Sequence, residues 1–472
     1  MGDPAGDLDF GSAAVMPRLI PAPKLPAEEL RFSDRQLLAL LAPLIAEQLL
    51  SYLVGLADSV MVSSAGGAAV SAVSMVDSIS VLLLNAFSAL ATGGAVVVGQ
   101  YWGHRDRKNS RLAARQLLVF LLMLSVGLTV LLELAQGPLL RLIYGRTDAA
   151  VLANCFAYYR IVMLSIPFIA VYNGAVALFR TLGDSTTPMR ISLLMNAVNV
   201  GGNAWLIYGL RLGVIGVAIP TLVSRGVAAA LICSLVLRPR FPLTVTPLRQ
   251  YRYDGRMIRS ILSIGVPNGI ENSMFQLGKI LLLSLVSTLP LAAITANAIG
   301  NTVGNFHVVV GVAVNSGMIP VVSQCVGAWD FSQARYYIRR LSVIIYWVQG
   351  LVCLVMILAI PLITRIYHAP QETAQLAAQV MLVHTVSSML LWPTAFALNN
   401  GMRAAGDARF SMAVSIASMW LFRVGLSYVL VGVLQTGVIG VWLAWAVDFL
   451  FRSIVFVIRY RGHRWEHTPL TR

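Results

Sequence analysis

The sequence reads Gly99-Gln100-Tyr101-Trp102-Gly103-His104-Arg105-Asp106 where one long apolar segment ends. The same Gln, Gly and Asp positions return 224 residues later in Ser323-Gln324-Cys325-Val326-Gly327-Ala328-Trp329-Asp330. Three other landmarks recur in the same order, at offsets of 223 or 224 residues: Pro43 with Glu47 as Pro267 with Glu271, Arg180 to Asp184 as Arg403 to Asp407, and Gly213 to Val217 as Gly437 to Val441. Four landmarks in one order indicate that the chain is a duplicated unit.

The composition predicts an integral membrane protein, because 57% of the residues are hydrophobic and only 12% are charged. A helix needs about 20 apolar residues to cross roughly 30 Å of hydrocarbon. Segments of that length are predicted at 36–62, 72–101, 112–134, 150–180, 188–210, 213–237, 257–287, 291–326, 337–360, 374–402, 411–433 and 437–458. The expected fold is therefore all-α, with twelve transmembrane helices in two six-helix lobes. Because six is even, the two repeats enter the membrane from the same side and are parallel.

The placement of the 35 Lys and Arg residues predicts the orientation of the chain. With the N-terminus inside, the cytoplasmic tails and loops hold 27 of them, the external loops hold four, and four fall within helices. This asymmetry predicts a plasma membrane (inner membrane) protein with both termini in the cytoplasm, and it explains the net charge of +15 without nucleic acid. No cleaved signal peptide is expected, so the first helix serves as the insertion signal.

These segments define five regions of the chain. We expect an N-terminal tail at 1–34, a first lobe at 35–237, a cytoplasmic linker at 238–256, a second lobe at 257–460 and a C-terminal tail at 461–472. No metal-binding histidine spacing, catalytic constellation or ATP-binding motif is evident, and the four cysteines have no paired spacing. The sequence thus predicts a protein that is not an enzyme, has no cofactor and uses an ion gradient or a partner chain for energy.

Ionisable side chains in the first lobe predict an ion site. An acidic residue at a helix centre costs roughly 2.5 to 3.5 kcal/mol on insertion scales, so Asp58 needs a partner, a water-filled cavity or a function. Asn199 and Asn203 lie on one face of the fifth segment, and Thr221 lies in the sixth. The Asp58 carboxyl could carry a proton, or it could hold Na⁺ together with these oxygen ligands. A hydrogen-bonded seam between helices is the alternative for the amides.

A second set of polar residues predicts a substrate cavity between the lobes. Its candidates are Glu47, Asp77, Glu271, Asn272, Gln276 and Asn301. Two alternatives remain open: Glu47 could satisfy helix ends near the cytoplasmic surface, and Lys279 could be a salt-bridge partner that makes Glu271 structural. Methionines and aromatic side chains such as Phe275 could line the cavity for bulky organic cations.

Several motifs together resemble the multidrug and toxic compound extrusion (MATE) family over about residues 35 to 460. They are Gly55-Leu56-Ala57-Asp58, Gln100 to Asp106, Arg180 to Pro188 with Asn196 and Asn199, Gln324 to Asp330, and Arg403 to Asp407. The resemblance implies a V-shaped pair of lobes and efflux of organic, often cationic, compounds in exchange for H⁺ or Na⁺. It implies a coupling-ion site at Asp58, Asn199 and Thr221, with Asn203 where some members have an acid.

We therefore expect a monomeric secondary antiporter in the lipid bilayer, which exports small organic, cationic compounds by alternating access. The main alternative is a lipid-linked glycan flippase, which several inward-facing cations in a groove would favour. A membrane enzyme without transport activity is the third alternative. The proposed ion site is asymmetric, because Asp58, Asn199 and Thr221 correspond in the repeat to Leu282, Arg423 and Trp445.

Overall fold

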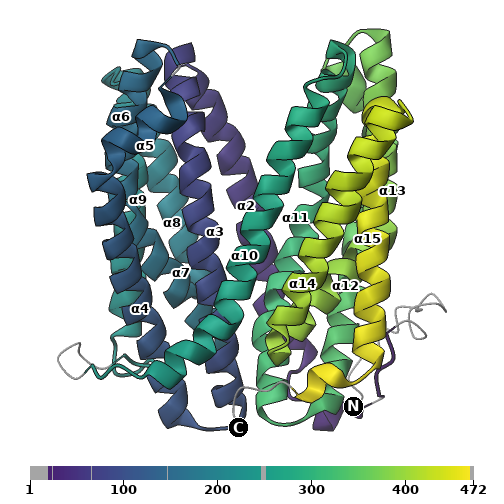
Figure 1. Ribbon diagram of the computed structural model, residues 1–472. Helices are drawn as coiled ribbons and strands as arrows, with labels where there is room; N and C mark the ends of the chain where they lie inside the picture. The colour runs from purple at the N-terminus through teal and green to yellow at the C-terminus, as the bar shows by residue number, and fades with distance from the viewer. Residues whose placement is uncertain (1–19, 24, 65, 146, 246–250, 468–472) are drawn as a thin grey trace, which may run out of the picture.

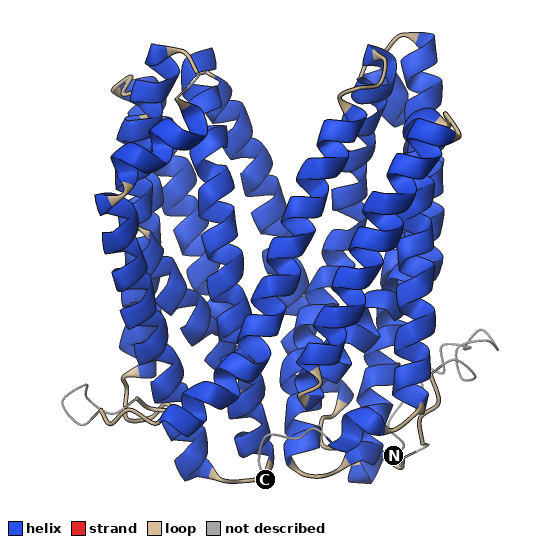
Figure 2. Cartoon of the chain, viewed as in Figure 1, coloured by secondary structure: helices blue, strands red, loops and turns tan. Residues whose placement is uncertain are grey.

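The computed structural model describes residues 20–23, 25–64, 66–145, 147–245 and 251–467. Within these residues the secondary structure is helical and contains no strand (Figure 2). This agrees with the all-α prediction. The helices fall into two groups, which we call the N-lobe (α2 to α9) and the C-lobe (α10 to α15).

The N-lobe contains α2 (Asp34–Ser63), α3 (Gly67–Gly103), α4 (Arg107–Leu134), α5 (Gln136–Tyr144), α6 (Ala149–Leu164), α7 (Ile166–Thr181), α8 (Thr186–Ala204) and α9 (Ile215–Val236). The C-lobe contains α10 (Gly255–Val286), α11 (Leu291–Gly327), α12 (Phe331–Ile366), α13 (Gln371–Ala405), α14 (Ala408–Ser418) and α15 (Gly437–Arg461). The π-helical segments Trp205–Gly209 and Val429–Val433 occupy equivalent places in the two lobes, 224 residues apart.

Nine helices in the described part of the chain are long and apolar enough to span a membrane. Counting α6 and α7, which meet at 40°, as one bent span raises the number to ten. The predicted count of twelve is not reproduced by this measure, because α8 and α10 are missing from it. Both helices carry many polar side chains, including Asn196 and Asn199 in α8 and Glu271 and Lys279 in α10.

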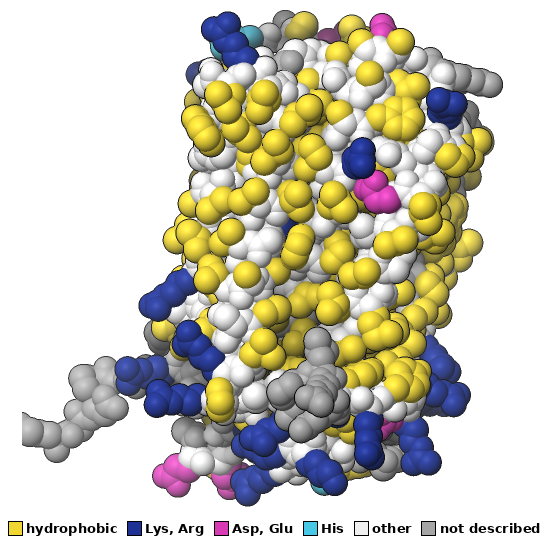
Figure 3. Space-filling model, turned by 90° about the vertical axis from the view of Figure 1, so that its left-hand side faces the viewer, with side chains coloured by type: hydrophobic (Ala, Val, Ile, Leu, Met, Phe, Trp, Pro, Cys, Tyr) yellow, Lys and Arg dark blue, Asp and Glu magenta, His cyan; other side chains and the backbone are white. Residues whose placement is uncertain are grey.

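The two lobes form a V, as Figure 1 shows. The lobes meet at the end of the molecule where α2 begins and α15 ends, and they diverge toward the opposite end. Lys and Arg side chains gather at the end where the lobes meet, whereas hydrophobic side chains cover much of the face above it (Figure 3). We call these two ends the closed end and the open end.

The two copies of the opening stretch form the same helix–turn–helix. Arg105 and Trp329 adopt left-handed backbone conformations, with φ of 62° and 59°, and turn the chain after α3 and α11. Asp106 then caps α4 by accepting a hydrogen bond from the Asn109 N–H (3.0 Å). This bond lowers the pKa of the Asp106 carboxyl, because it favours the ionised form. Asp330 caps α12 in the same way.

Each lobe's first helix packs against the second helix of the other lobe, α2 against α11 and α10 against α3. At the closed end α3 and α11 cross so closely that a Cβ on Gly103 would overlap the Gln324 carbonyl, and one on Gly327 would overlap the Gln100 carbonyl. Only glycine allows this approach.

Two hydrogen bonds link the lobes beside this crossing. The Gln100 side chain of the N-lobe donates to the Ala404 carbonyl of the C-lobe (3.1 Å). The Gln324 side chain of the C-lobe donates to the Thr181 carbonyl of the N-lobe (2.7 Å). We call this pair the crossed glutamine bonds. They join the landmarks that the duplication repeats, so each lobe uses its repeated glutamine to hold the other.

Candidate functional site

Polar side chains from three N-lobe helices form a hydrogen-bonded chain around Asp58. Asn203 on α8 donates to the Asp58 carboxylate on α2 (Nδ2 to Oδ1, 3.1 Å) and lies 3.4 Å from Asn199 Oδ1. Asn199 in turn donates to the Thr221 hydroxyl on α9 (3.3 Å). The structure thus brings together all four residues predicted for the coupling-ion site. Helical spacing places the two asparagines on one face of α8, toward α2 and α9.

The oxygen atoms of this cluster form a set of hard ligands. Asn203 is only 1% exposed, and its Oδ1 accepts no hydrogen bond within the described residues. A buried carbonyl oxygen without a donor is unfavourable, and a cation at this point would satisfy it. The oxygens of Asp58, Asn199, Asn203 and Thr221 are of the hard type that Na⁺ prefers, and the Asp58 carboxylate is the group among them that can take up a proton. No group of three or more His, Cys, Asp or Glu residues in the described chain could hold a metal ion.

Asp77 lies beside this cluster in the N-lobe and does not line the cavity described below. Its carboxylate accepts a hydrogen bond from the Tyr158 hydroxyl (3.0 Å). Asp77 is close enough to Asp58 and Arg225 for its carboxylate to interact with their charges. Asn301, its counterpart in the repeat, donates to the Asn297 carbonyl of its own helix and does not line that cavity either.

The repeated glutamates form one ion pair in each lobe. Glu47 Oε2 lies 2.8 Å from Arg180 Nη2, and Glu271 Oε2 lies 2.7 Å from Arg403 Nη2. In each case the glutamate and the arginine belong to landmarks that the duplication repeats. The alternative in which Lys279 is the salt-bridge partner of Glu271 is therefore wrong, because the Glu271 carboxylate pairs with the buried guanidinium of Arg403. Glu47 likewise pairs with an arginine side chain, while no hydrogen bond to a helix end is found in the described residues.

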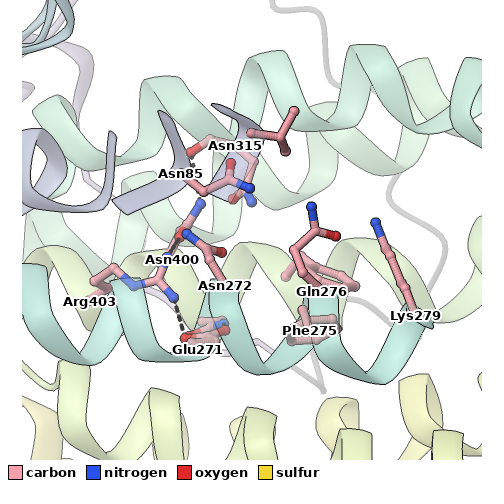
Figure 4. Close-up of a pocket in the computed structure, with 12 residues that line it drawn as sticks. Asn85, Glu271, Asn272, Phe275, Gln276, Lys279, Asn315, Asn400 and Arg403 are labelled. Atoms are coloured by element: carbon pink, nitrogen blue, oxygen red, sulfur yellow. Dashed lines mark hydrogen bonds and ion pairs between the residues drawn. The ribbon is translucent and has the colours of Figure 1, made fainter. Parts of the chain in front are cut away.

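A cavity of about 490 Å³ lies between the lobes, mostly against the C-lobe (Figure 4). It is lined by Val81 and Asn85 from α3, by Glu271, Asn272, Phe275, Gln276 and Lys279 from α10, by Asn315 from α11, and by Phe396, Asn399, Asn400 and Arg403 from α13. Three of the six predicted cavity residues line it: Glu271, Asn272 and Gln276. Glu47, Asp77 and Asn301 do not.

The prediction missed the amide side chains that α3, α11 and α13 contribute to the cavity lining. Asn399 donates to Glu271 Oε1 (3.2 Å), and Arg403 donates to Asn400 Oδ1 (2.7 Å). The sequence held one signal for Arg403. Arg180 recurs as Arg403 and Glu47 recurs as Glu271 at nearly the same offset, so each half contains one arginine and one glutamate that can pair. The asparagines have no such signal, because they meet only once the helices pack.

Behind the cavity wall the C-lobe buries a group of charges. Asp448 accepts from Arg452 (2.8 Å) and forms an ion pair with Arg423 (2.5 Å). Ser418 also donates to this carboxylate. Asp448 and Arg452 lie one turn apart on α15, so this pair forms within a single helix.

The C-lobe equivalent of the N-lobe cluster around Asp58 has the opposite charge. Where the N-lobe has Asp58, Asn199 and Thr221, the C-lobe has Leu282, Arg423 and Trp445. The Arg423 guanidinium lies 4.5 Å from the centre of the Trp445 ring. The duplication therefore kept the scaffold and placed an acid in one lobe and a cation in the other.

Comparisons with known proteins agree with this architecture. The MatE family matches residues 43–205 and again residues 267–429, once in each lobe. The uncharacterized transporter YisQ of Bacillus subtilis is 25% identical over 91% of this chain and 94% of its own length. The probable multidrug resistance protein YoeA of the same organism is 26% identical over 86% and 88%. A crystal structure of a MATE P26A mutant shares the fold, with a TM-score of 0.85, 19% identity and coverage of 91% and 95%.

Proposed function

Because the chain belongs to the MatE family of multidrug and toxic compound extrusion transporters, we propose that it exports small organic compounds in exchange for H⁺ or Na⁺ by alternating access. It is a transporter that spans the membrane several times. The observation that carries the proposal is the acid and amide cluster of the N-lobe, which lies apart from the cavity near the C-lobe. An exchanger needs a site for each of its two ligands.

The charge asymmetry supports an orientation in the membrane. Loops with many Lys and Arg residues tend to stay in the cytoplasm. The basic residues gather at the closed end (Figure 3), so the closed end is proposed to face the cytoplasm and the open end to face the outside. In this orientation both termini would be cytoplasmic, the protein would lie in the plasma membrane, and the V of Figure 1 would correspond to an outward-open state.

Coupling follows from the difference in affinity between conformations. A ligand shifts an equilibrium only by its differential affinity for the two states, and two ligands of one protein affect each other reciprocally. A cation at Asp58 would draw the oxygens of Asn199, Asn203 and Thr221 toward it and change how α2, α8 and α9 pack. Because α2 also packs against α11 of the C-lobe, that change reaches the other lobe. Substrate would then displace the ion in the inward-open state.

The ion gradient supplies the energy in this proposal, so neither ATP nor a partner chain is required, and a single chain forms both sites. The lipid-linked glycan flippase is the less favoured alternative. YoeA is named as a probable multidrug resistance protein, which supports export of small organic molecules. The expectation that these molecules are cationic rested on the resemblance and on the aromatic side chains.

The test uses purified protein in proteoliposomes, under pH and Na⁺ gradients imposed separately, with a panel of organic dyes. Asp58→Asn is expected to abolish gradient-driven transport while the protein remains folded and inserted. Glu372→Gln, which makes the same chemical change at an exposed position on α13, is the matched control and should transport normally. Near-normal transport by the Asp58 variant, or no response of the wild type to either gradient, would refute the proposal.

A further inference from the structure

Lys279 is a cation without a counterion in the cavity. It makes no hydrogen bond or ion pair with any other residue that the structure describes, and its side chain is exposed to the cavity. Figure 4 shows its ammonium group and the Gln276 amide extending from α10 in the same direction. A charge held in a groove between two lobes is desolvated on part of its surface, so it favours a ligand of opposite sign.

Glu271, the acid of the cavity wall, cannot neutralise Lys279, because it already pairs with another cation. Glu271 forms its ion pair with Arg403 and accepts a second hydrogen bond from Asn399. It is 5% exposed, so little of its carboxylate faces the cavity. The lining therefore carries two cations and one paired anion, with a net charge of +1.

The buried charges behind the wall have the same sign. Arg423 and Arg452 share the single carboxylate of Asp448, which leaves a net charge of +1 in that group. The Arg452 guanidinium lies 4.5 Å from the centre of the Phe275 ring, and Phe275 lines the cavity. One aromatic layer thus separates this positive group from the cavity, and the low dielectric of the protein does little to screen it.

The rest of the wall suits an organic molecule with an anionic group. The amides of Asn272 and Gln276 can donate hydrogen bonds to the oxygens of a carboxylate, sulfonate or phosphate. Phe275 and Phe396 offer flat apolar surfaces for the body of the molecule. No unpaired carboxylate is present among the lining residues to attract an organic cation.

We infer that the cavity binds aromatic organic anions, with the anionic group of the ligand held by Lys279 and Gln276. This assigns a substrate class to the exporter proposed above and rests on that proposal for its role in transport. It is opposite in charge to the cationic compounds that the sequence led us to expect. The exchanger would then bind its cation in the N-lobe and its organic anion beside the C-lobe.

Binding of two dyes with one ring system and opposite charge tests the inference. Fluorescence anisotropy of the detergent-solubilised full chain is measured with 5-carboxyfluorescein, an anion, and with rhodamine 123, a cation. The wild type is expected to bind carboxyfluorescein more tightly. Lys279→Gln should weaken that binding about 10- to 100-fold, as expected for loss of a charge-assisted hydrogen bond. Lys279→Arg should retain it, and Lys279→Glu should shift the preference toward rhodamine 123.

The inference is overturned if carboxyfluorescein does not bind to the wild type, if rhodamine 123 binds more tightly, or if Lys279→Glu binds carboxyfluorescein like the wild type. Size-exclusion profiles of the variants show that each is folded. Glu372→Gln, at an exposed position that does not line the cavity, should bind carboxyfluorescein like the wild type. Binding that depends on Lys279, in a protein that answers to neither ion gradient, would refute the antiport proposal and support this inference.

A lipid head group could supply the same anionic chemistry as a soluble compound. Competition separates the two sources: dioctanoylphosphatidylglycerol is added to the carboxyfluorescein complex in parallel with benzoate. Displacement by benzoate identifies a soluble aromatic anion, as the inference requires. Displacement by the lipid alone overturns the assignment to a soluble compound.

Discussion

Substitution of Gly327 by alanine is expected to open the closed end of the V. The new Cβ would overlap the Gln100 backbone carbonyl on the other lobe. A flexible side chain could move aside, but a backbone carbonyl inside a helix cannot. The ends of α3 and α11 must then separate, and both crossed glutamine bonds are lost.

The magnitude follows from those two bonds. A buried hydrogen bond contributes about 0.5–1.5 kcal/mol net, so losing both removes roughly 1–3 kcal/mol from the state that is closed at this end. That corresponds to about a 5- to 150-fold change in the ratio of the two conformations. Gln324→Ala, which removes one donor and leaves the Thr181 carbonyl without it, should shift the ratio by about 5-fold.

Spin labels on the two lobes measure the change. Ser63 at the end of α2 and Ser287 just after α10 are exposed, and they lie on opposite lobes at the open end. Both serines are changed to cysteine for labelling, and Cys233 is changed to alanine. When the closed end opens, the open end closes, so the distance distribution between the labels should gain a shorter component in the Gly327 variant. Gly350→Ala is the control, because a Cβ there meets no atom within 4 Å. If the two variants give the same distribution, the crossing does not hold the lobes together.

Four further substitutions test the packing of charges and caps, and each is measured by thermal unfolding in detergent. Glu271→Gln is expected to destabilise the protein more than Glu47→Gln, because removing one partner of a buried pair costs roughly 3–5 kcal/mol and the Glu47 pair is more exposed; equal midpoints would contradict this. Asp448→Asn leaves two buried guanidinium groups with only an amide between them, so it is expected to lower the midpoint of thermal unfolding. A midpoint close to that of the wild type would exclude a structural role for the carboxylate. Asp106→Ala removes a helix cap worth about 1 kcal/mol. Because the Asn109 N–H lowers the pKa of that carboxyl, the stabilisation is present above its ordinary pKa and is lost as the pH falls below about 4, so the difference between variant and wild type should shrink in acid.

The helical class, the duplication and the proximity of Asp58, Asn199, Asn203 and Thr221 were accessible from the sequence. Apolar length predicts helices directly, and the spacing of Asn199 and Asn203 predicts a shared face. The number of spans was less well determined. A helix that lines a cavity, such as α10 with Glu271 and Lys279, carries polar residues that lower its hydropathy, so composition alone undercounts the helices that matter most.

The partners of the buried charges were not accessible in the same way. Local spacing suggested Lys279 as the partner of Glu271, two helical turns away on α10, but the observed partner is Arg403 on another helix. Helix packing decides between such candidates, and one sequence does not reveal it. The asparagines of the cavity lining that the prediction missed come from three helices distant in sequence, for the same reason.

The crossed glutamine bonds have the form of a contact between identical subunits. Two copies of one protein related by a twofold axis present the same patch to each other, so residue i of one meets residue j of the other and the reverse also holds. Gln100 with Ala404 and Gln324 with Thr181 fulfil this relation within one chain. The chain thus carries a homodimer interface between its own halves, and the linker between α9 and α10 has removed the need for those halves to be identical. Such a self-complementary patch restrains only the residues within it, and the rest of each half can diverge, so that one half has Asn199 where the other has Arg423.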